Sequence, residues 1–209
     1  ELSHQSAVLH PKAPKPEKKD PIGKFILQHI CPLENKKGFH FWSYDKSIFT
    51  PVIRKEIRRL TTSNRGHYCV YLPAYSPAYL YDILSKVPEV TWHIFSQQNV
   101  MFSKKNNCLF YPANNAVFLE SFSSCEGILC GAGFETPAEA LFLGKKLMVI
   151  PMKGQYEQQC NAAALRRLGI ETASVLNLKS VSQLNHWISE RTSLKMEYAD
   201  MSEKIIESL

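Results

Sequence analysis

The 209-residue sequence lacks the residue patterns that bind metal ions or cross membranes. Its four aspartates form no D-x-D pair, its seven histidines show no H-x-x-x-H or H-E-x-x-H spacing, and its six cysteines include no C-x-x-C pair. No apolar run approaches the roughly 20 residues of a transmembrane helix. We therefore expect neither a metal site nor an integral membrane protein.

The composition is typical of a folded protein, because 44% of the residues are hydrophobic and only 21% are charged. It excludes a disordered or collagen-like chain. Most of the cysteines have apolar neighbours, where a reduced cysteine behaves as a small hydrophobic residue. They are Cys31, Cys69, Cys108, Cys125, Cys130 and Cys160. Scattered, reduced cysteines favour a cytoplasmic location.

Positive charge is concentrated in the amino-terminal third of the chain. Residues 1–66 carry a net charge of +7, whereas residues 67–209 carry −1. A basic segment can attract nucleic acid, an anionic membrane surface or a phosphorylated substrate, but it is more often a solvated arm. We expect no nucleic-acid partner, because the segment has no RNA-binding aromatic motif. Four of its side chains should be solvated or face a missing domain or a membrane: Arg54, Lys55, Arg58 and Arg59.

Strands and helices alternate from about residue 66 onward. Five short, almost wholly apolar segments are typical of strands: 67–72, 91–95, 108–111, 127–130 and 146–150. Ser76 and Pro77 predict the start of a helix after the first strand, and a second helix is predicted over 115–123. The alternation predicts an α/β fold with a Rossmann-like parallel sheet flanked by helices. Ligands of such sheets bind at the carboxyl ends of the strands.

The sequence divides into three parts. Residues 65–175 contain the alternating strands and helices. Residues 1–64 contain an apolar segment at 23–30 and a basic helix candidate at 50–60, but neither begins a complete domain, and the first residue is not Met. We interpret them as the end of a missing neighbouring domain plus a basic linker. Residues 176–209 have helical periodicity and predict two closing carboxyl-terminal helices.

Segment 131–140, between the fourth strand and a helix, has the pattern of an anion site. Its small residues let a ligand approach the backbone, and a helix that begins there points unpaired N–H groups at the ligand. A diphosphate would need no metal ion there. The segment also fits a capping box, in which Thr136 caps the helix and Glu139 reaches back to it. The complete dinucleotide fingerprint is absent, which disfavours NAD.

A polar run follows the last predicted strand. Glu157, Gln158 and Asn161 are spaced so that they share one face if a helix begins there. Carboxamides and a carboxylate beside a phosphate site suit a polyhydroxylated ligand. The alternative is an ordinary polar helix start.

Together, these two motifs resemble the donor-binding half of GT-B glycosyltransferases. The family pattern is Gly, an aromatic residue, any residue, Ser or Thr, two further residues, Glu-Ala, then Pro, then Asp/Glu-Gln-x-x-Asn. The chain matches this pattern at residues 133–141, at Pro151 and at residues 157–161. Over residues 66–175 it is similar both to plant secondary-product transferases and to the lipid-linked GlcNAc transferase of peptidoglycan synthesis.

The resemblance implies a role for each matching residue, and it implies no metal and no cofactor besides the nucleotide sugar. The donor diphosphate would contact Gly131, Ala132, Gly133, Phe134, Glu135 and Thr136; the ribose would contact Glu139; the donor sugar would contact Glu157, Gln158 and Asn161; and the base would contact Tyr111, Pro112 and Ala113.

Two positions depart from the plant-type pattern. Gly131 replaces a histidine, so that an imidazole contact to phosphate is lost. Glu135 replaces an asparagine and adds a negative charge beside the diphosphate. That carboxylate must point away or be neutralised, and Lys153 is the candidate cation.

We therefore expect a glycosyltransferase fragment that binds a UDP-sugar, for transfer of a hexose or N-acetylhexosamine to an acceptor hydroxyl. In that resemblance, residues 1–64 are the remnant of the acceptor domain, which would carry the general base. The fragment alone should then turn over little. His4 is the only candidate base in the remnant, although such a histidine is more often a surface or core residue.

The expected partners are a nucleotide sugar and the missing amino-terminal domain, with an anionic membrane surface or a lipid-linked acceptor as further candidates. Two other functions stay open. One is a non-hydrolysing UDP-sugar 2-epimerase, and the other is a non-catalytic binding module with a basic interaction arm.

Overall fold

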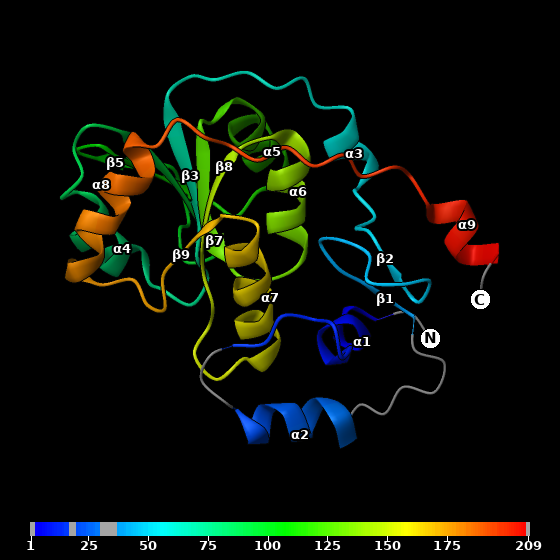
Figure 1. The fold of residues 1–209 in the computed structure, drawn as a ribbon. Helices are drawn as coiled ribbons and strands as arrows, with labels where there is room; N and C mark the ends of the chain where they lie inside the picture. Colours follow the sequence, from blue (N-terminus) through cyan, green and yellow to red (C-terminus); the bar gives the residue numbers. More distant parts are fainter. Residues whose placement is uncertain (1–2, 17–19, 30–36, 208–209) are drawn as a thin grey trace.

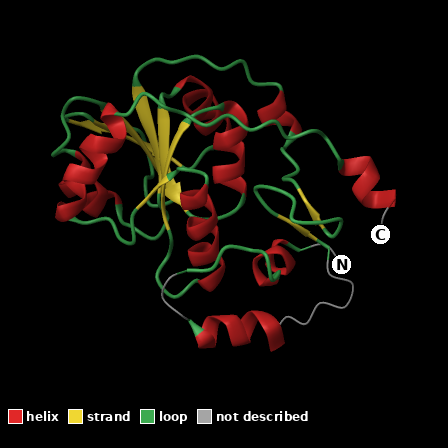
Figure 2. Ribbon diagram, viewed as in Figure 1, coloured by secondary structure: helices red, strands yellow, loops and turns green. Residues whose placement is uncertain are grey.

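The computed structural model describes residues 3–16, 20–29 and 37–207, so that Cys31 lies outside the described residues. Its centre is a seven-stranded sheet in the order β5-β6-β4-β3-β7-β8-β9, in which only β5 pairs antiparallel. The strands are β3 (His67–Tyr71), β4 (Thr91–Ser96), β5 (Ser103–Lys105), β6 (Cys108–Pro112), β7 (Gly127–Gly131), β8 (Lys146–Ile150) and β9 (Glu171–Thr172). Helices flank the sheet (Figures 1 and 2). The predicted α/β fold is confirmed.

The flanking helices cover both faces of the sheet because alternate side chains of its strands enter two hydrophobic cores. Cys69 of β3 packs in the core that contains Phe122 and Leu141, whereas its neighbour Val70 packs in the core that contains Trp187. Helices of the first core are α5 (Asn115–Ser124), α6 (Glu135–Leu143) and α7 (Tyr156–Arg167), and helices of the second are α4 (Pro77–Leu84) and α8 (Val181–Ser189). Because both faces of the sheet are covered, ligands can reach only the ends of its strands.

Local signals explain where these helices begin and end. The Ser76 hydroxyl caps α4 by accepting a hydrogen bond from the Tyr79 N–H, as the sequence predicts. Asn114 caps α5 in the same way. Gly144 ends α6 in the left-handed conformation, at φ 67°, which favours glycine.

The carboxyl-terminal segment contains the two predicted closing helices, of which the second is short. Between α8 and the short helix α9 (Ser202–Glu207), the chain has no regular secondary structure. Leu194, Met196 and Tyr198 pack against the first core at a spacing of two residues. This spacing is the period of an extended chain rather than of a helix, which explains why the second helix begins only at Ser202.

The amino-terminal segment packs beside α7 (Figure 1). Its elements are α1 (His4–Leu9), α2 (Pro21–His29), the parallel pair β1 (Gly38–Phe39) and β2 (Ile48–Phe49), and α3 (Lys55–Arg58). The basic helix predicted over 50–60 is thus a single turn. No helix in the described ranges combines the length and apolar character needed to cross a bilayer.

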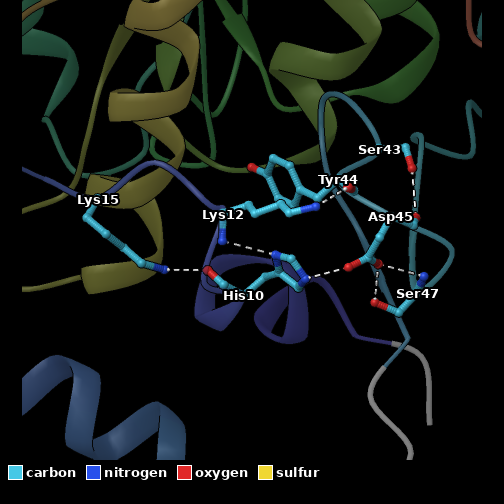
Figure 3. A network of polar contacts seen from close by, with 7 residues as sticks. All are labelled: His10, Lys12, Lys15, Ser43, Tyr44, Asp45 and Ser47. Atoms are coloured by element: carbon cyan, nitrogen blue, oxygen red, sulfur yellow. Dashed lines mark hydrogen bonds and ion pairs between the residues drawn. The ribbon is translucent and has the colours of Figure 1, made fainter.

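A polar network joins the end of α1 to the β1–β2 connection (Figure 3). His10 Nε2 donates to Asp45 Oδ2 at 2.8 Å, and His10 Nδ1 accepts from the Lys12 N–H at 3.2 Å. Asp45 also accepts from the backbone N–H and hydroxyl of Ser47. The Ser47 bonds, and then the His10 bond, lower the pKa of Asp45 to about 2. The network orders a segment whose own elements are too short to form a core.

Trp187 connects α8 to the sheet, because its ring meets that of Tyr68 with centroids 5.0 Å apart and it is 4% exposed. We expect Trp187→Ala to lower the free energy of unfolding by about 3 to 5 kcal/mol in urea titrations. The neighbouring His186→Ala, whose side chain is 65% exposed, should change it by less than about 0.5 kcal/mol. Equal effects would show that α8 does not pack as described.

Candidate functional site

A cleft of about 730 Å³ lies at the carboxyl ends of the central strands. It is lined by the ends of β3, β7 and β8, by the start of α6 and by one side of α7. Tyr71, Gly131, Gly133, Thr136 and Gln158 are among its lining residues. The position agrees with the edge at which parallel sheets bind ligands.

The loop after β7 presents an open backbone to this cleft. A Cβ atom added at Gly133 would meet no atom within 4 Å, so the protein itself leaves the space beside this glycine free. Helix α6 begins directly after the loop with Phe134 at the N-cap position and no side-chain cap. The start of this helix can therefore donate its N–H groups to a ligand.

The capping box predicted over 136–139 is wrong. Thr136 lies inside α6 rather than at its N-cap, and Glu139 does not reach back to the helix start. Instead, Arg54 donates from Nε to Glu139 Oε1 at 2.6 Å and from Nη2 to Oε2 at 3.0 Å. Both carboxylate oxygens of Glu139, the residue expected to bind the ribose, therefore have a cationic partner in this structure.

Arg54 was expected to be solvated or to face away; 45% of its side chain is exposed, but its guanidinium also binds Glu139 of α6. Its hydrogen bonds to Glu139 raise its pKa, and the charges of Glu139, Glu135 and Glu56 add to the effect. Arg54, not Lys153, is thus the cation near Glu135. Lys153 is exposed at the cleft, and the described ion pairs include none between it and Glu135.

The other three basic side chains of this segment have different surroundings. Lys55 and Arg59 are exposed, as expected. Arg58 instead donates to the backbone carbonyls of Ile53 and Tyr198 and lies over the Phe142 ring. Arg58 therefore holds the linker and the carboxyl-terminal segment against α6.

The three polar residues of α7 have different surroundings. Gln158 lines the cleft and accepts from the Met152 N–H at 3.0 Å. Glu157 is partly exposed, with 32% of its side chain accessible. Asn161 is fully buried, and its Nδ2 donates to the Ala132 carbonyl at 3.1 Å. Asn161 therefore supports the loop from behind, and in this structure its amide is not available to a donor sugar.

A smaller pocket of about 220 Å³ adjoins the cleft and shares Tyr71 and Thr136 with it. Of the three residues expected at the base, Ala113 lines this pocket. Tyr111 stacks on Phe95 with ring centroids 5.1 Å apart, and its carbonyl accepts from Asn99. The Pro112 carbonyl accepts from the Asn114 N–H. The backbone carbonyls of two of these three residues thus bind partners within the protein.

Sequence reasoning missed Tyr71 and Arg54 as site residues. Tyr71 could have been found, because it lies at the carboxyl end of a predicted strand. Arg54 could not, because it comes from a linker 85 residues before its partner and carries no motif.

His4, the one candidate base, packs against the loop. Its Nδ1 is 2.7 Å from the Phe39 carbonyl, its Nε2 is 2.8 Å from Asn161 Oδ1, and its ring stacks on Phe134. Both ring nitrogens of His4 thus lie within hydrogen-bond distance of protein oxygens. In the described part of the chain, no group of three or more His, Cys, Asp or Glu side chains could hold a metal ion.

The profile of glycosyl transferase family 1 matches residues 28–190. The chain belongs to this family. The match includes the loop, the uncapped helix and the polar start of α7, and it favours the transferase over the epimerase. No curated protein matches the chain.

Solved glycosyltransferase structures resemble the family-1 chain at low sequence identity. The glycosyltransferase of kitacinnamycin is 14% identical, with a TM-score of 0.51 over 74% of this chain and 47% of its own. The spinosyn forosaminyltransferase SpnP is 13% identical, with a TM-score of 0.48; the match covers 83% of this chain and 54% of SpnP. The glycosyltransferase SnogD from Streptomyces nogalater is 15% identical, with a TM-score of 0.45; the match covers 91% of this chain and 55% of SnogD. The chain therefore spans about half the length of these structures, and the first of them shows a common fold.

The Arg54–Glu139 pair can be tested by Glu139→Gln, which removes the charge but keeps the shape. We expect the free energy of unfolding to fall by about 1 to 3 kcal/mol, because a largely buried charged hydrogen-bond pair is lost. The effect should be near the lower value, because 45% of the Arg54 side chain is exposed.

Glu135→Gln is the matched control. It removes the same charge from the first turn of α6, but Glu135 is exposed and makes no described side-chain bond. We expect it to change stability by less than about 0.5 kcal/mol. Equal melting temperatures for Glu139→Gln and wild type would show that the pair does not contribute to stability in solution.

Proposed function

We propose that the cleft binds the nucleoside-diphosphate sugar of a glycosyltransferase reaction. The observation that carries this proposal is the open space beside Gly133 in front of an uncapped helix start. Unpaired N–H groups and the helix dipole both favour a negative ligand there, and the dipole contributes about 0.3 to 1 kcal/mol. Family membership supports a diphosphate-linked sugar as that ligand.

The shape of the site suggests how such a donor would lie. We assign the diphosphate to the backbone of residues 131–136, the base to the small pocket beside Ala113, and the sugar to the side of the cleft that contains Gln158. The ribose would lie between the cleft and the small pocket, near Thr136, which lines both. To contact Glu139 there, its hydroxyls must share or replace the bonds from Arg54. UDP remains our preferred nucleotide, and a hexose or N-acetylhexosamine our preferred sugar.

We assign residues 1–64 to the acceptor-binding half, residues 65–175 to the donor-binding half and residues 176–209 to its closing segment. The described part of residues 1–64 packs beside the loop of residues 131–136, through α1 and the strand pair β1–β2. Because the chain spans about half of the transferase structures that it resembles, we expect it to bind donor and to turn over little by itself. A membrane surface or a lipid-linked acceptor remains a candidate partner. A cytoplasmic location is supported by the five described cysteines, which are buried and free.

The first test of this function replaces Gly133 by valine. A Cβ atom at this position meets no protein atom within 4 Å, so we expect the melting temperature to stay unchanged. The same side chain would occupy the space into which we place the diphosphate, and we expect the affinity for UDP, measured by calorimetry, to fall by at least about tenfold. Unchanged affinity in a stable Gly133→Val protein would exclude this loop as the diphosphate site.

A second test concerns the metal ion. We expect the chain to bind at least one of UDP, dTDP and GDP equally well in EDTA and in Mg²⁺ at constant ionic strength, because helix N–H groups rather than a cation would hold the phosphates. Loss of binding in EDTA would contradict this account of the site. Weak and equal binding of all three nucleotides would contradict a base-specific pocket.

A further inference from the structure

Arg54 reaches the candidate site from the linker that precedes β3. It stands at the N-cap position of α3, and its guanidinium extends to a residue of α6 that lies 85 positions further along the chain. Its side chain also lines the small pocket of about 220 Å³ that adjoins the cleft. The same pocket is lined by Thr136, in the first turn of α6. Arg54 therefore lies beside the helix start to which we assign the diphosphate.

Glu139, the partner of Arg54, is the more deeply buried member of the pair. Only 4% of Glu139 is exposed, and among the described residues it is not one of those that line the cleft or the small pocket. By contrast, 45% of the Arg54 side chain is exposed. Of the two charged groups, the guanidinium is thus the one that a ligand in the small pocket can reach.

The bonds to Glu139 hold the guanidinium in one orientation. Nε and Nη2 of Arg54 donate to the two carboxylate oxygens, at 2.6 and 3.0 Å. Two of the five N–H donors are used in this way, and the described part of the chain gives the other three no hydrogen-bond partner. A planar guanidinium that is fixed on one side and has donors left on the other is well suited to a phosphate group, whose oxygens accept pairs of N–H bonds.

The carboxylates of α6 explain why a cation is needed at this position. Glu135 and Glu139 lie in the first two turns of the helix, next to the loop that we assign to an anion. Like charges repel, so an unbalanced carboxylate here would oppose phosphate binding. The hydrogen bond to Glu139 raises the pKa of Arg54, which stays positive at every ordinary pH. Arg54 thus balances one carboxylate and still presents N–H donors to a ligand.

We propose that Arg54 contacts a phosphate group of the bound nucleotide, and that Glu139 is the positioning residue that holds Arg54 there. This role rests on the proposed function of the cleft. It differs from the role that the family resemblance gives to Glu139, because the carboxylate then acts through Arg54 instead of binding the ribose itself. A residue of the amino-terminal segment thereby completes the nucleotide site.

The choice of variants follows from the burial of Glu139. Removing Arg54 alone would leave a buried carboxylate without its cation and destabilise the fold. Both members are therefore replaced in Arg54→Met/Glu139→Gln, which is compared with Glu139→Gln alone. Arg54→Lys keeps a cation for Glu139 but lacks the planar fork, and it serves as a second test if the double variant does not fold. Lys55→Met is the matched control, because Lys55 is the next cation in the chain and is exposed.

The affinity of each 209-residue protein for UDP is measured by calorimetry at low salt. We expect the double variant to bind UDP at least roughly tenfold more weakly than wild type, because a charge-assisted hydrogen bond to phosphate is lost. Glu139→Gln should stay within about threefold of wild type, since Arg54 keeps its charge. Arg54→Lys should lose at least about threefold, because its single nitrogen replaces the fork. Lys55→Met should bind UDP like wild type.

The dependence of affinity on salt separates a phosphate contact from a structural effect. Salt screens the attraction between a partly exposed guanidinium and a phosphate. We therefore expect the UDP affinity of wild type to fall more steeply with salt than that of the double variant. Melting temperatures recorded at each salt concentration show which proteins are folded.

The outcomes separate this role from the function of the cleft. If wild type binds UDP and the folded Arg54 variants bind it equally well, the contact is excluded while the function of the cleft stands. A loss in Glu139→Gln as large as in the double variant would show that Glu139 itself is the ligand and would overturn the proposal. A loss with unchanged salt dependence would indicate only a structural role for Arg54 and would likewise overturn it. If wild type binds none of UDP, dTDP and GDP, the proposed function fails and takes this role with it.

Discussion

Burial of β3, β7 and β8 on both faces is the constraint on which the other features of the molecule depend. Their side chains fill two hydrophobic cores, so neither face of the sheet can present polar groups to a ligand. The parallel register pairs Tyr71 with Cys130 and Gly131 with Ile150, which brings the carboxyl ends of all three strands to one level. The loop after β7, the polar segment after β8 and the end of β3 therefore meet at a single cleft, and the uncapped start of α6 opens there.

The amino-terminal segment contributes a cation, Arg54, that this arrangement needs. A helix start with Glu135 and Glu139 in its first two turns would repel an anion if those carboxylates were unbalanced. Arg54 binds Glu139 from the linker, and His4 lies against the loop from α1. The basic character of residues 1–66 is thus partly used inside the molecule, next to the site, and is not only a property of an exposed arm.

The sequence predicted the sheet well because its strong signals are local. Each of the five predicted strands is a short apolar run closed by a turn or a proline, and the corresponding strands begin at the predicted residues. β5 was not recognised because its three residues are exposed and polar, and β9 because it has only two residues. The second closing helix is shorter than the periodicity of residues 176–209 suggests, because Leu194, Met196 and Tyr198 pack at a spacing of two residues before α9 begins.

For the candidate site, the sequence by itself determined the fold class, the position of the glycine loop before a helix and the polar start of α7, since each depends on residues within a few positions of one another. Only the tertiary structure decided what those side chains bind. The spacing of Glu157, Gln158 and Asn161 is helical, but packing sends Asn161 behind the loop and leaves Gln158 at the cleft. Glu139 and Asn161 have partners 85 and 157 residues away, in Arg54 and His4. Such pairs leave no local pattern, because they form only when the amino-terminal segment folds back onto the sheet.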